Sequence, residues 1–154
     1  MSHRASPAAL AVLLATAAAG CAGGPQRDVL MESVRTYNEG VRWARFTAAA
    51  VAVPPAERDQ FLDEREALAE DLRITDYEVV RVANHARTAD VQVKMTWFLD
   101  SRGTVHDTWI RQRWERQGKA WRVVDERRVR GEAMPGLAEA APGEVPTDGP
   151  TAVD

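Results

Sequence analysis

The amino-acid sequence predicts an α+β domain in which two N-terminal helices pack on a four-stranded antiparallel meander. Apolar residues recur at three- or four-residue steps over residues 28–72, which is typical of amphipathic helices. They alternate with polar residues over much of 74–129, as expected for strands. Packing the helical stripes against one face of the sheet would bury both apolar surfaces in a single core.

The first helix is expected to run from Asp28, which can cap its N-terminus, to Ala50. Its apolar stripe consists of Leu30, Val34, Tyr37, Val41, Ala44 and Ala48. Pro54 and Pro55 end this helix, and Pro55 suits the first turn of a second one. The apolar face of the second helix consists of Phe61, Leu62, Leu68, Ala69 and Leu72.

Four strands should follow, joined by short turns. The expected strands span residues 74–83, 91–99, 105–116 and 120–129. The turns are expected at Asn84-His85, at Asp100 to Gly103 and at Gln117-Gly118, where the residue types favour tight turns. Such short connections imply that each strand pairs antiparallel with the next.

The first residues of the chain have the pattern of an export signal. Arg4 precedes an uncharged, mostly apolar run over residues 8–19, which Gly20 and Cys21 follow. The run is shorter than the roughly 20 apolar residues that a membrane-spanning helix needs. The segment Ala18-Ala19-Gly20-Cys21 resembles the bacterial lipobox. This resemblance implies that residues 1–20 are a signal peptide and that Cys21 carries acyl chains.

The lipobox resemblance also implies a location. Several acyl chains anchor a protein durably, so the membrane would be a partner through Cys21. Because Ala22 stands where an inner-membrane retention signal has aspartate, the resemblance implies an exported protein at the outer membrane, facing the periplasm. Cys21 is the only cysteine, so an intramolecular disulfide is excluded. The alternative is an ordinary signal peptide with a stray thiol at Cys21.

The rest of the chain divides into a tether, one domain and a tail. We expect a tether over residues 21–27, a single domain over 28–131 and a disordered Pro/Gly/Ala-rich tail over 132–154. The net charge of −3 gives no indication of nucleic-acid binding.

Within residues 28–130, three segments resemble the NTF2-like and cystatin-like superfamilies, whose curved sheet wraps helices into a cone. These segments are Tyr37 to Trp43, Thr108-Trp109 with Trp114, and Gly118 to Val124. A short strand and a third helix that are usual in these families are not expected here. The resemblance therefore implies a cone with a small pocket.

The resemblance makes acids and histidines candidate catalytic residues, because NTF2-like enzymes use an Asp or His inside the cone as a general base. His85 and His106 fall at or beside expected turns and are interpreted as surface residues. Asp107 and Asp125 share strand faces with apolar residues, so either could be a pocket acid paired with Arg111 or Arg127. A structural ion pair is the favoured interpretation. No catalytic residue, cofactor or metal site is assigned.

The five tryptophans suggest either an aromatic core or an aromatic pocket. Trp97, Trp109 and Trp121 fit one sheet face, and core packing is the favoured role, whereas Trp114 falls on the opposite face from Trp109 and could be an exposed contact. If a pocket exists, its expected lining is Trp43, Met95, Trp97, Asp107, Trp109, Trp121 and Asp125.

Charge is divided unevenly, with an acidic second helix and a basic C-terminal pair of strands. A possible surface for an anionic partner consists of Arg111, Arg113, Arg122 and Arg128. Lipopolysaccharide, peptidoglycan or an acidic envelope protein would fit it. A solvated strand face, balanced in part by the acidic helix, is the favoured alternative.

These observations favour a non-enzymatic, lipid-anchored module that binds a partner in the bacterial envelope or has a structural role there. A small-molecule-binding or isomerase- or dehydratase-like cone is the alternative. A structural lipoprotein that forms homodimers through its sheet is a third possibility.

Overall fold

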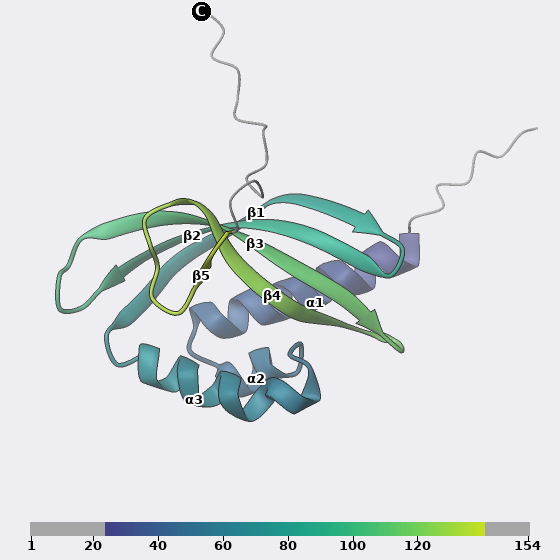
Figure 1. Cartoon of the computed structure of the whole chain (residues 1–154), viewed down its shortest axis with the longest axis horizontal. Coiled ribbons are helices and arrows are strands. Elements are labelled where there is room, and N and C mark those ends of the chain that lie inside the picture. The colour runs from purple at the N-terminus through teal and green to yellow at the C-terminus, as the bar shows by residue number, and fades with distance from the viewer. Residues whose placement is uncertain (1–23, 141–154) are drawn as a thin grey trace, which may run out of the picture.

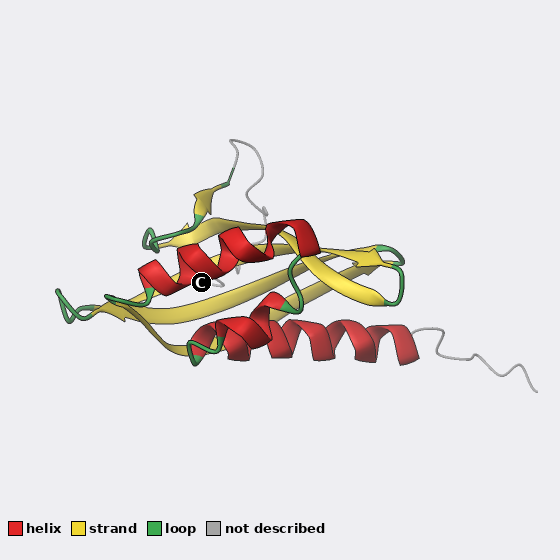
Figure 2. Ribbon diagram, turned by 90° about the horizontal axis from the view of Figure 1, so that it is seen from below, coloured by secondary structure: helices red, strands yellow, loops and turns green. Residues whose placement is uncertain are grey.

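The computed structural model describes residues 24–140 and shows helices on one side of a curved sheet (Figures 1 and 2). The helices are α1 (Gly24–Arg42), α2 (Phe46–Ala50) and α3 (Arg58–Leu68), with a 3-10 turn at Pro55–Glu57. The strands are β1 (Leu72–His85), β2 (Thr88–Leu99), β3 (Val105–Gln117), β4 (Ala120–Gly131) and β5 (Ala138–Glu139). Their order in the sheet is β1-β2-β3-β4-β5. The predicted α+β class and the antiparallel meander are confirmed.

The first helix differs from its prediction at both ends. It begins at Gly24, so residues 24–27 belong to α1 and not to a tether. It ends at Arg42, because Ala44 adopts a left-handed φ of 52° that no α-helix continues through. The chain then forms α2, which packs closely on Gly40: a Cβ atom there would lie 2.8 Å from the Cβ of Ala49. The expected single helix to Ala50 is thus two helices.

The sheet follows the predicted strands with longer ends. β1 pairs with β2, β2 with β3, and β3 with β4, all antiparallel. The first turn lies at Ala86 and Arg87, beyond the expected Asn84-His85, and Ala86 has a φ of 59°. Register shifts occur twice in the β1–β2 ladder and twice in the β3–β4 ladder. Such bulges bend a sheet and increase its twist, which accounts for its curvature over the helices.

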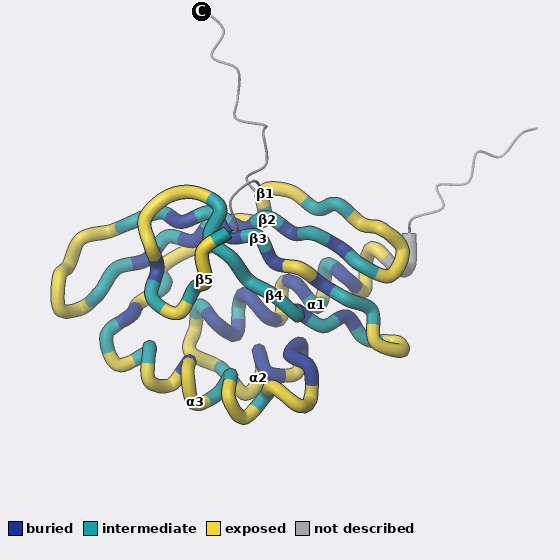
Figure 3. The backbone as a smooth tube through the Cα atoms, viewed as in Figure 1, coloured by how far each residue is buried: buried dark blue, intermediate teal, exposed yellow. Residues whose placement is uncertain are grey.

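The core lies between the helices and the concave face of the sheet. In β2, buried and half-buried residues alternate, as expected for a strand with one covered face (Figure 3). The buried cluster includes Leu30, Val34, Tyr37, Val41, Val91, Val93, Met95, Trp97, Ile110, Trp114, Trp121 and Val123. Within the described residues, no helix is long and apolar enough to cross a membrane.

The domain continues beyond its predicted end at residue 131. Met134 is 3% exposed and belongs to the core, and β5 pairs parallel with β4 through Arg127 and Arg128. Because these contacts are tertiary, the local abundance of proline and glycine could not reveal them. Residues 132–140 are therefore part of the fold. Cys21, the expected signal peptide and the tail beyond residue 140 lie outside the described residues.

Candidate functional site

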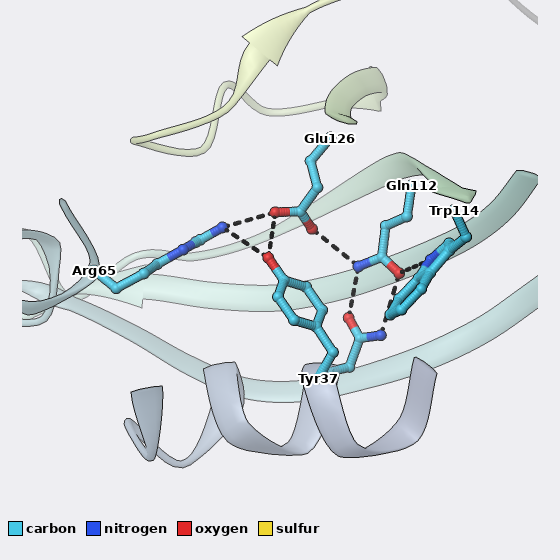
Figure 4. A network of polar contacts seen from close by, with 6 residues as sticks. Tyr37, Arg65, Gln112, Trp114 and Glu126 are labelled. Carbon is cyan, nitrogen blue, oxygen red and sulfur yellow. Dashed lines mark hydrogen bonds and ion pairs between the residues drawn. The ribbon is translucent and has the colours of Figure 1, made fainter. Parts of the chain in front are cut away.

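A carboxylate on the concave face of β4 organises an extensive, largely buried polar cluster (Figure 4). Glu126 on β4 accepts a 2.6 Å hydrogen bond from the Tyr37 hydroxyl of α1 and a 2.8 Å ionic contact from the Arg65 guanidinium of α3. Its other oxygen accepts a 3.0 Å hydrogen bond from Gln112 on β3. Four elements that are distant in sequence therefore meet at this carboxylate.

A β-bulge places Glu126 inside the domain. On β4, Trp121 and Val123 face the core. The ladder then shifts: Trp114 pairs with Val123, whereas Arg113 pairs with Asp125, which leaves Val124 as the additional residue. A one-residue shift moves the following side chains to the other face. Glu126 consequently lies opposite the fully buried Gln112, and Asp125 faces outward.

The cluster extends deeper into the core through two amides. The Gln112 amide nitrogen donates to Asn38 Oδ1 at 2.8 Å, and the Asn38 amide nitrogen donates to the backbone carbonyl of Val34 at 2.8 Å. The Trp114 indole nitrogen donates to Gln112 Oε1 at 3.3 Å. Asn38, Gln112 and Trp114 are 0% exposed. Buried polar groups are costly unless paired, so these bonds specify how α1 docks on the sheet. We call these six residues the Glu126 cluster: Tyr37, Asn38, Arg65, Gln112, Trp114 and Glu126.

The surroundings of the cluster change the proton affinity of its members. Burial, together with the charge of Glu126, raises the pKa of the Tyr37 hydroxyl well above its ordinary range. Burial alone would lower the pKa of Arg65, but Tyr37 and Glu126 reverse that effect and raise it. The arginine therefore stays charged and the phenol neutral.

The raised pKa of Tyr37 predicts a two-step tyrosine titration. A folded-state pKa above the unfolded value stabilises the protein below pH ~10, and this stabilisation is lost as the pH rises further. Of the two tyrosines, Tyr77 also has a raised pKa, from burial and Glu39, but it is less buried. We expect the tyrosinate absorbance of Tyr77 to appear while circular dichroism is native, and that of Tyr37 only with unfolding. Tyr37→Phe should remove the second step; simultaneous ionisation in the folded protein would contradict the assignment.

A cavity of about 250 Å³ reaches the edge of the cluster. It lies between α1, α3, β4 and the segment before β5, and its lining includes Tyr37, Phe61, Arg65, Val123 and Glu126. The side chains of Arg65 and Glu126 are 10% and 13% exposed. A small polar molecule in this cavity could therefore approach an ion pair that is largely shielded from solvent.

A second cavity, of about 350 Å³, lies beside the C-terminal end of α1. Its lining combines the apolar side chains of Val41, Phe46, Leu68 and Ile74 with Arg65, Trp43 and other residues. Arg65 thus borders both cavities. Trp43, a predicted pocket residue, lies at the surface with 58% exposure, and its indole nitrogen donates to Glu39 at 2.8 Å. This volume falls in the range of small-molecule sites.

The two acids selected from the sequence have different surroundings. Asp107 lies opposite Thr96 on the convex face, where it accepts a 2.7 Å hydrogen bond from Thr96 and pairs with Lys94 at 3.0 Å. The hydrogen bonds of Thr96 and Lys94 lower the pKa of Asp107. Asp125 pairs with Arg127 at 2.9 Å and borders the smaller cavity. Asp125 thus forms an ion pair with the expected Arg127, whereas Asp107 pairs with Lys94 and with neither Arg111 nor Arg127, and the structure does not bring the two acids together.

The tryptophans are distributed differently from the sequence interpretation. Met95, Trp97 and Trp121 are each 2% exposed and lie in the core. Trp114, expected on the exposed face, is 0% exposed, whereas Trp109 lies on the convex face between Lys94 and Arg130. The sequence pattern correctly placed Trp109 and Trp114 on opposite faces of β3, but it expected Trp109 to be the buried one. Trp114 is buried instead, because Thr108, Ile110 and Gln112 are the inward residues of β3.

The four arginines of the predicted anionic-partner surface do not form one continuous face. Arg111 and Arg113 lie on the convex face, opposite Arg127 and Asp125. Arg122 hydrogen-bonds the backbone carbonyl of Val51. Arg128 pairs with Glu139 at 2.5 Å and stabilises β5. The bulges in β4 separate these side chains, so only Arg111 and Arg113 remain neighbours on the convex face.

The two histidines within residues 24–140 have ordinary structural surroundings. His85 is exposed at the end of β1, and His106 stacks on Trp97 with ring centroids 4.8 Å apart. Among residues 24–140, no three His, Cys, Asp or Glu side chains gather in a group that could hold a metal ion.

Comparison with known proteins identifies the fold. No family model and no curated protein matches the chain. A ketosteroid isomerase-like protein from Erwinia carotovora superposes with a TM-score of 0.54 and 14% identity, over 67% of this chain and 94% of that protein. An NTF2-like protein from Cytophaga hutchinsonii gives 0.52 and 10%, over 66% and 94%. A SEC-C motif-containing protein from Rhodopseudomonas palustris gives 0.53 and 15%, over 71% and 88%. The chain therefore has the NTF2-like fold, with helices packed on a curved, mostly antiparallel sheet.

Proposed function

We propose that this protein is an exported lipoprotein of the bacterial envelope, anchored through acyl chains on Cys21, whose domain binds a partner without catalysing a reaction. The lipobox-like segment before Cys21 supports the anchor. Ala22 after the cysteine supports the outer membrane, with the domain facing the periplasm. An envelope protein, peptidoglycan or lipopolysaccharide is the partner class that this location supplies.

The pairing of Glu126 is the observation that most favours binding over catalysis. A general base needs a carboxylate oxygen that can reach a substrate proton. Both oxygens of Glu126 already accept contacts, from Tyr37 and Arg65 on one side and from Gln112 on the other. Breaking these contacts to reach a substrate would disrupt an arrangement that holds four elements together. The Glu126 cluster is therefore best suited to a structural role beneath a binding surface.

Small-molecule binding or isomerase-like chemistry in the cone is a second candidate function. The larger cavity favours it, because apolar walls beside a guanidinium provide both burial and a polar contact for a ligand. A ligand there would order the exposed Trp43 ring and stabilise the fold by mass action. A thermal-shift screen of small carboxylates and ring compounds, repeated with Trp43→Ala, would detect it. Ligands that stabilise the native chain but not the variant would favour this candidate over the first.

A labelling experiment tests the anchor. Cells that express the full chain should incorporate labelled palmitate into it, and the protein should remain with the membrane fraction after a high-salt wash. Cys21→Ser should abolish both, because no other cysteine is available. A Ser33→Ala variant with the cysteine retained is the matched control. Equal labelling of Cys21→Ser and the control would refute lipidation at Cys21.

Affinity capture from solubilised envelope tests partner binding and the convex face. We expect the native lipidated chain to retain a specific envelope component. An Arg111→Gln/Arg113→Gln variant alters the convex face, and Arg45→Gln/Arg102→Gln removes the same charge elsewhere. Loss with the first pair alone would place the partner on the convex face. A native chain that retains no envelope component would favour a ligand in the cavity instead. Elution of the native chain as a dimer that forms through the convex face would favour a homodimer.

A further inference from the structure

The start of α1 and two strand turns lie at the same end of the domain. α1 begins at the same end of the sheet as the β1–β2 turn and the β3–β4 turn, as both views show (Figures 1 and 2). A backbone hydrogen bond of 2.8 Å from Arg116 to Arg87 joins these two hairpins. The two turns are therefore fixed relative to each other, at the end of the sheet where α1 begins.

This end is covalently close to Cys21. Only Ala22 and Gly23 separate Cys21 from Gly24, the first residue of α1. Consecutive Cα atoms lie about 3.8 Å apart, so Cys21 and Gly24 are separated by at most about 11 Å whatever the path between them. An acylated Cys21 would consequently hold this end of the domain, and no other, at the bilayer surface.

The same end is rich in positive charge. Its basic residues are Arg27, Arg87, Arg116 and Lys119, which we call the basic end; its acidic residues include Asp28 and Glu115. Arg27, Arg87 and Lys119 are exposed. The chain as a whole has a net charge of −3, so this local excess of positive charge differs in sign from the molecule's overall charge.

The opposite end carries charges of both signs: Asp100, Arg73 and Arg102 are exposed there, and Arg73 pairs with Asp100 at 2.6 Å. Glu66 and Glu70 are exposed in and just after α3, immediately before β1 begins at Leu72. The basic end adjoins the other terminus of β1, where the 14-residue strand finishes at His85. A strand rises about 3.3 Å per residue, so these charges are separated by roughly 45 Å. Because the two signs largely offset each other at that end, the basic end, with its excess of positive charge, is the one that a negatively charged membrane would attract.

We propose that the basic end is a membrane-contacting surface that binds anionic phospholipid headgroups and holds the domain upright on the bilayer. The proposal rests on the lipidation of Cys21 for its position, but the charge arrangement is independent of it. Basic side chains close to an anionic bilayer are attracted within a Debye length of the surface. Acyl chains would supply the attachment, and the basic end would set the orientation.

This orientation has a consequence for partner access. α1 has 19 residues and rises about 1.5 Å per residue, so its C-terminal end lies roughly 28 Å from its start. The larger cavity and Trp43 adjoin that far end. They would face away from the membrane, where a soluble ligand or a partner can reach them.

Vesicle binding by the unlipidated chain tests the basic end separately from the anchor. The full chain with Cys21→Ser is sedimented with vesicles of phosphatidylcholine alone or with added phosphatidylglycerol. We expect anionic vesicles to bind it more strongly, and Arg87→Gln/Lys119→Gln to weaken that binding by about tenfold. Arg45→Gln/Arg102→Gln, which removes the same charge elsewhere, should have a much smaller effect. Equal losses from both pairs would overturn the proposal.

Spin labelling of the lipidated chain tests the orientation. An acylated Cys21 has no free thiol, so a cysteine introduced by Gln117→Cys at the β3–β4 turn, or by Thr104→Cys at the opposite end, is the only labelling site. After reconstitution in anionic vesicles, with acylation checked by mass spectrometry, the first label should contact the headgroups and the second should remain in water. Equal exposure to water would overturn the orientation. An unacylated cysteine in the mass spectrum would refute the anchor, while the sedimentation result would still decide whether the basic end binds lipid.

Discussion

Glu126→Ala should lower the free energy of unfolding by about 3 to 5 kcal/mol, because it leaves the buried Arg65 without its counterion. The Arg65 and Glu126 side chains are only 10% and 13% exposed, so water replaces little of the lost interaction. Tyr37 and Gln112 also lose their acceptor. Urea denaturation of the full chain, followed by circular dichroism, measures the change.

Two further variants separate the ion pair from general disruption of β4. Asp125→Ala removes the adjacent carboxylate, whose partner Arg127 is partly exposed, and should cost less than about 1 kcal/mol. Arg65→Met/Glu126→Gln removes both charges, and the introduced amide can accept from Gln112 and donate to the Tyr37 hydroxyl. This double variant should be more stable than Glu126→Ala. A double variant that is less stable would show that the ion pair itself, and not the unpaired arginine, dominates.

Local sequence patterns were sufficient to predict α3 and the four long strands. Alternation over residues 91–99 placed β2, and the prolines at 54 and 55 placed the junction before α3, because each signal acts within a few residues. The break in α1 was missed because the alanine at position 44 favours helix, whereas packing of α2 on Gly40 requires a turn there. Residues 132–140 were missed for the same reason, since burial of Met134 is a tertiary contact.

The Glu126 cluster could not be predicted from local sequence patterns because of an irregularity in β4. Strict alternation along residues 121–129 puts Glu126 on the solvent side and Asp125 inside, so Asp125 was the candidate pocket acid. The bulge at Val124 reverses this assignment. The available signal was the apolar pair Val123-Val124, which breaks alternation at the point where the strand shifts. Burial of Asn38 and Gln112 had no comparable signal, because each amide depends on the other across the core.

The assignment of faces on β3 predicts the second large effect. Trp114→Ala should lower the free energy of unfolding by about 3 to 5 kcal/mol, because it opens a cavity in the centre of the core. Trp114 is 0% exposed, contacts Tyr37 edge to face with ring centroids 5.8 Å apart, and donates to Gln112. The loss would therefore propagate into the Glu126 cluster.

Trp109→Ala is the matched control on the same strand, five residues earlier and on the convex face. This substitution removes the contacts of the indole ring with two cationic groups, Lys94 at 5.4 Å and Arg130 at 4.1 Å. Each contact contributes about 0.5 to 1 kcal/mol at an exposed site. Chemical denaturation should therefore rank Trp114→Ala well below Trp109→Ala in stability. The opposite ranking would mean that β3 presents its odd-numbered side chains to the core, and Glu126, through its pairing with Gln112, would then face solvent.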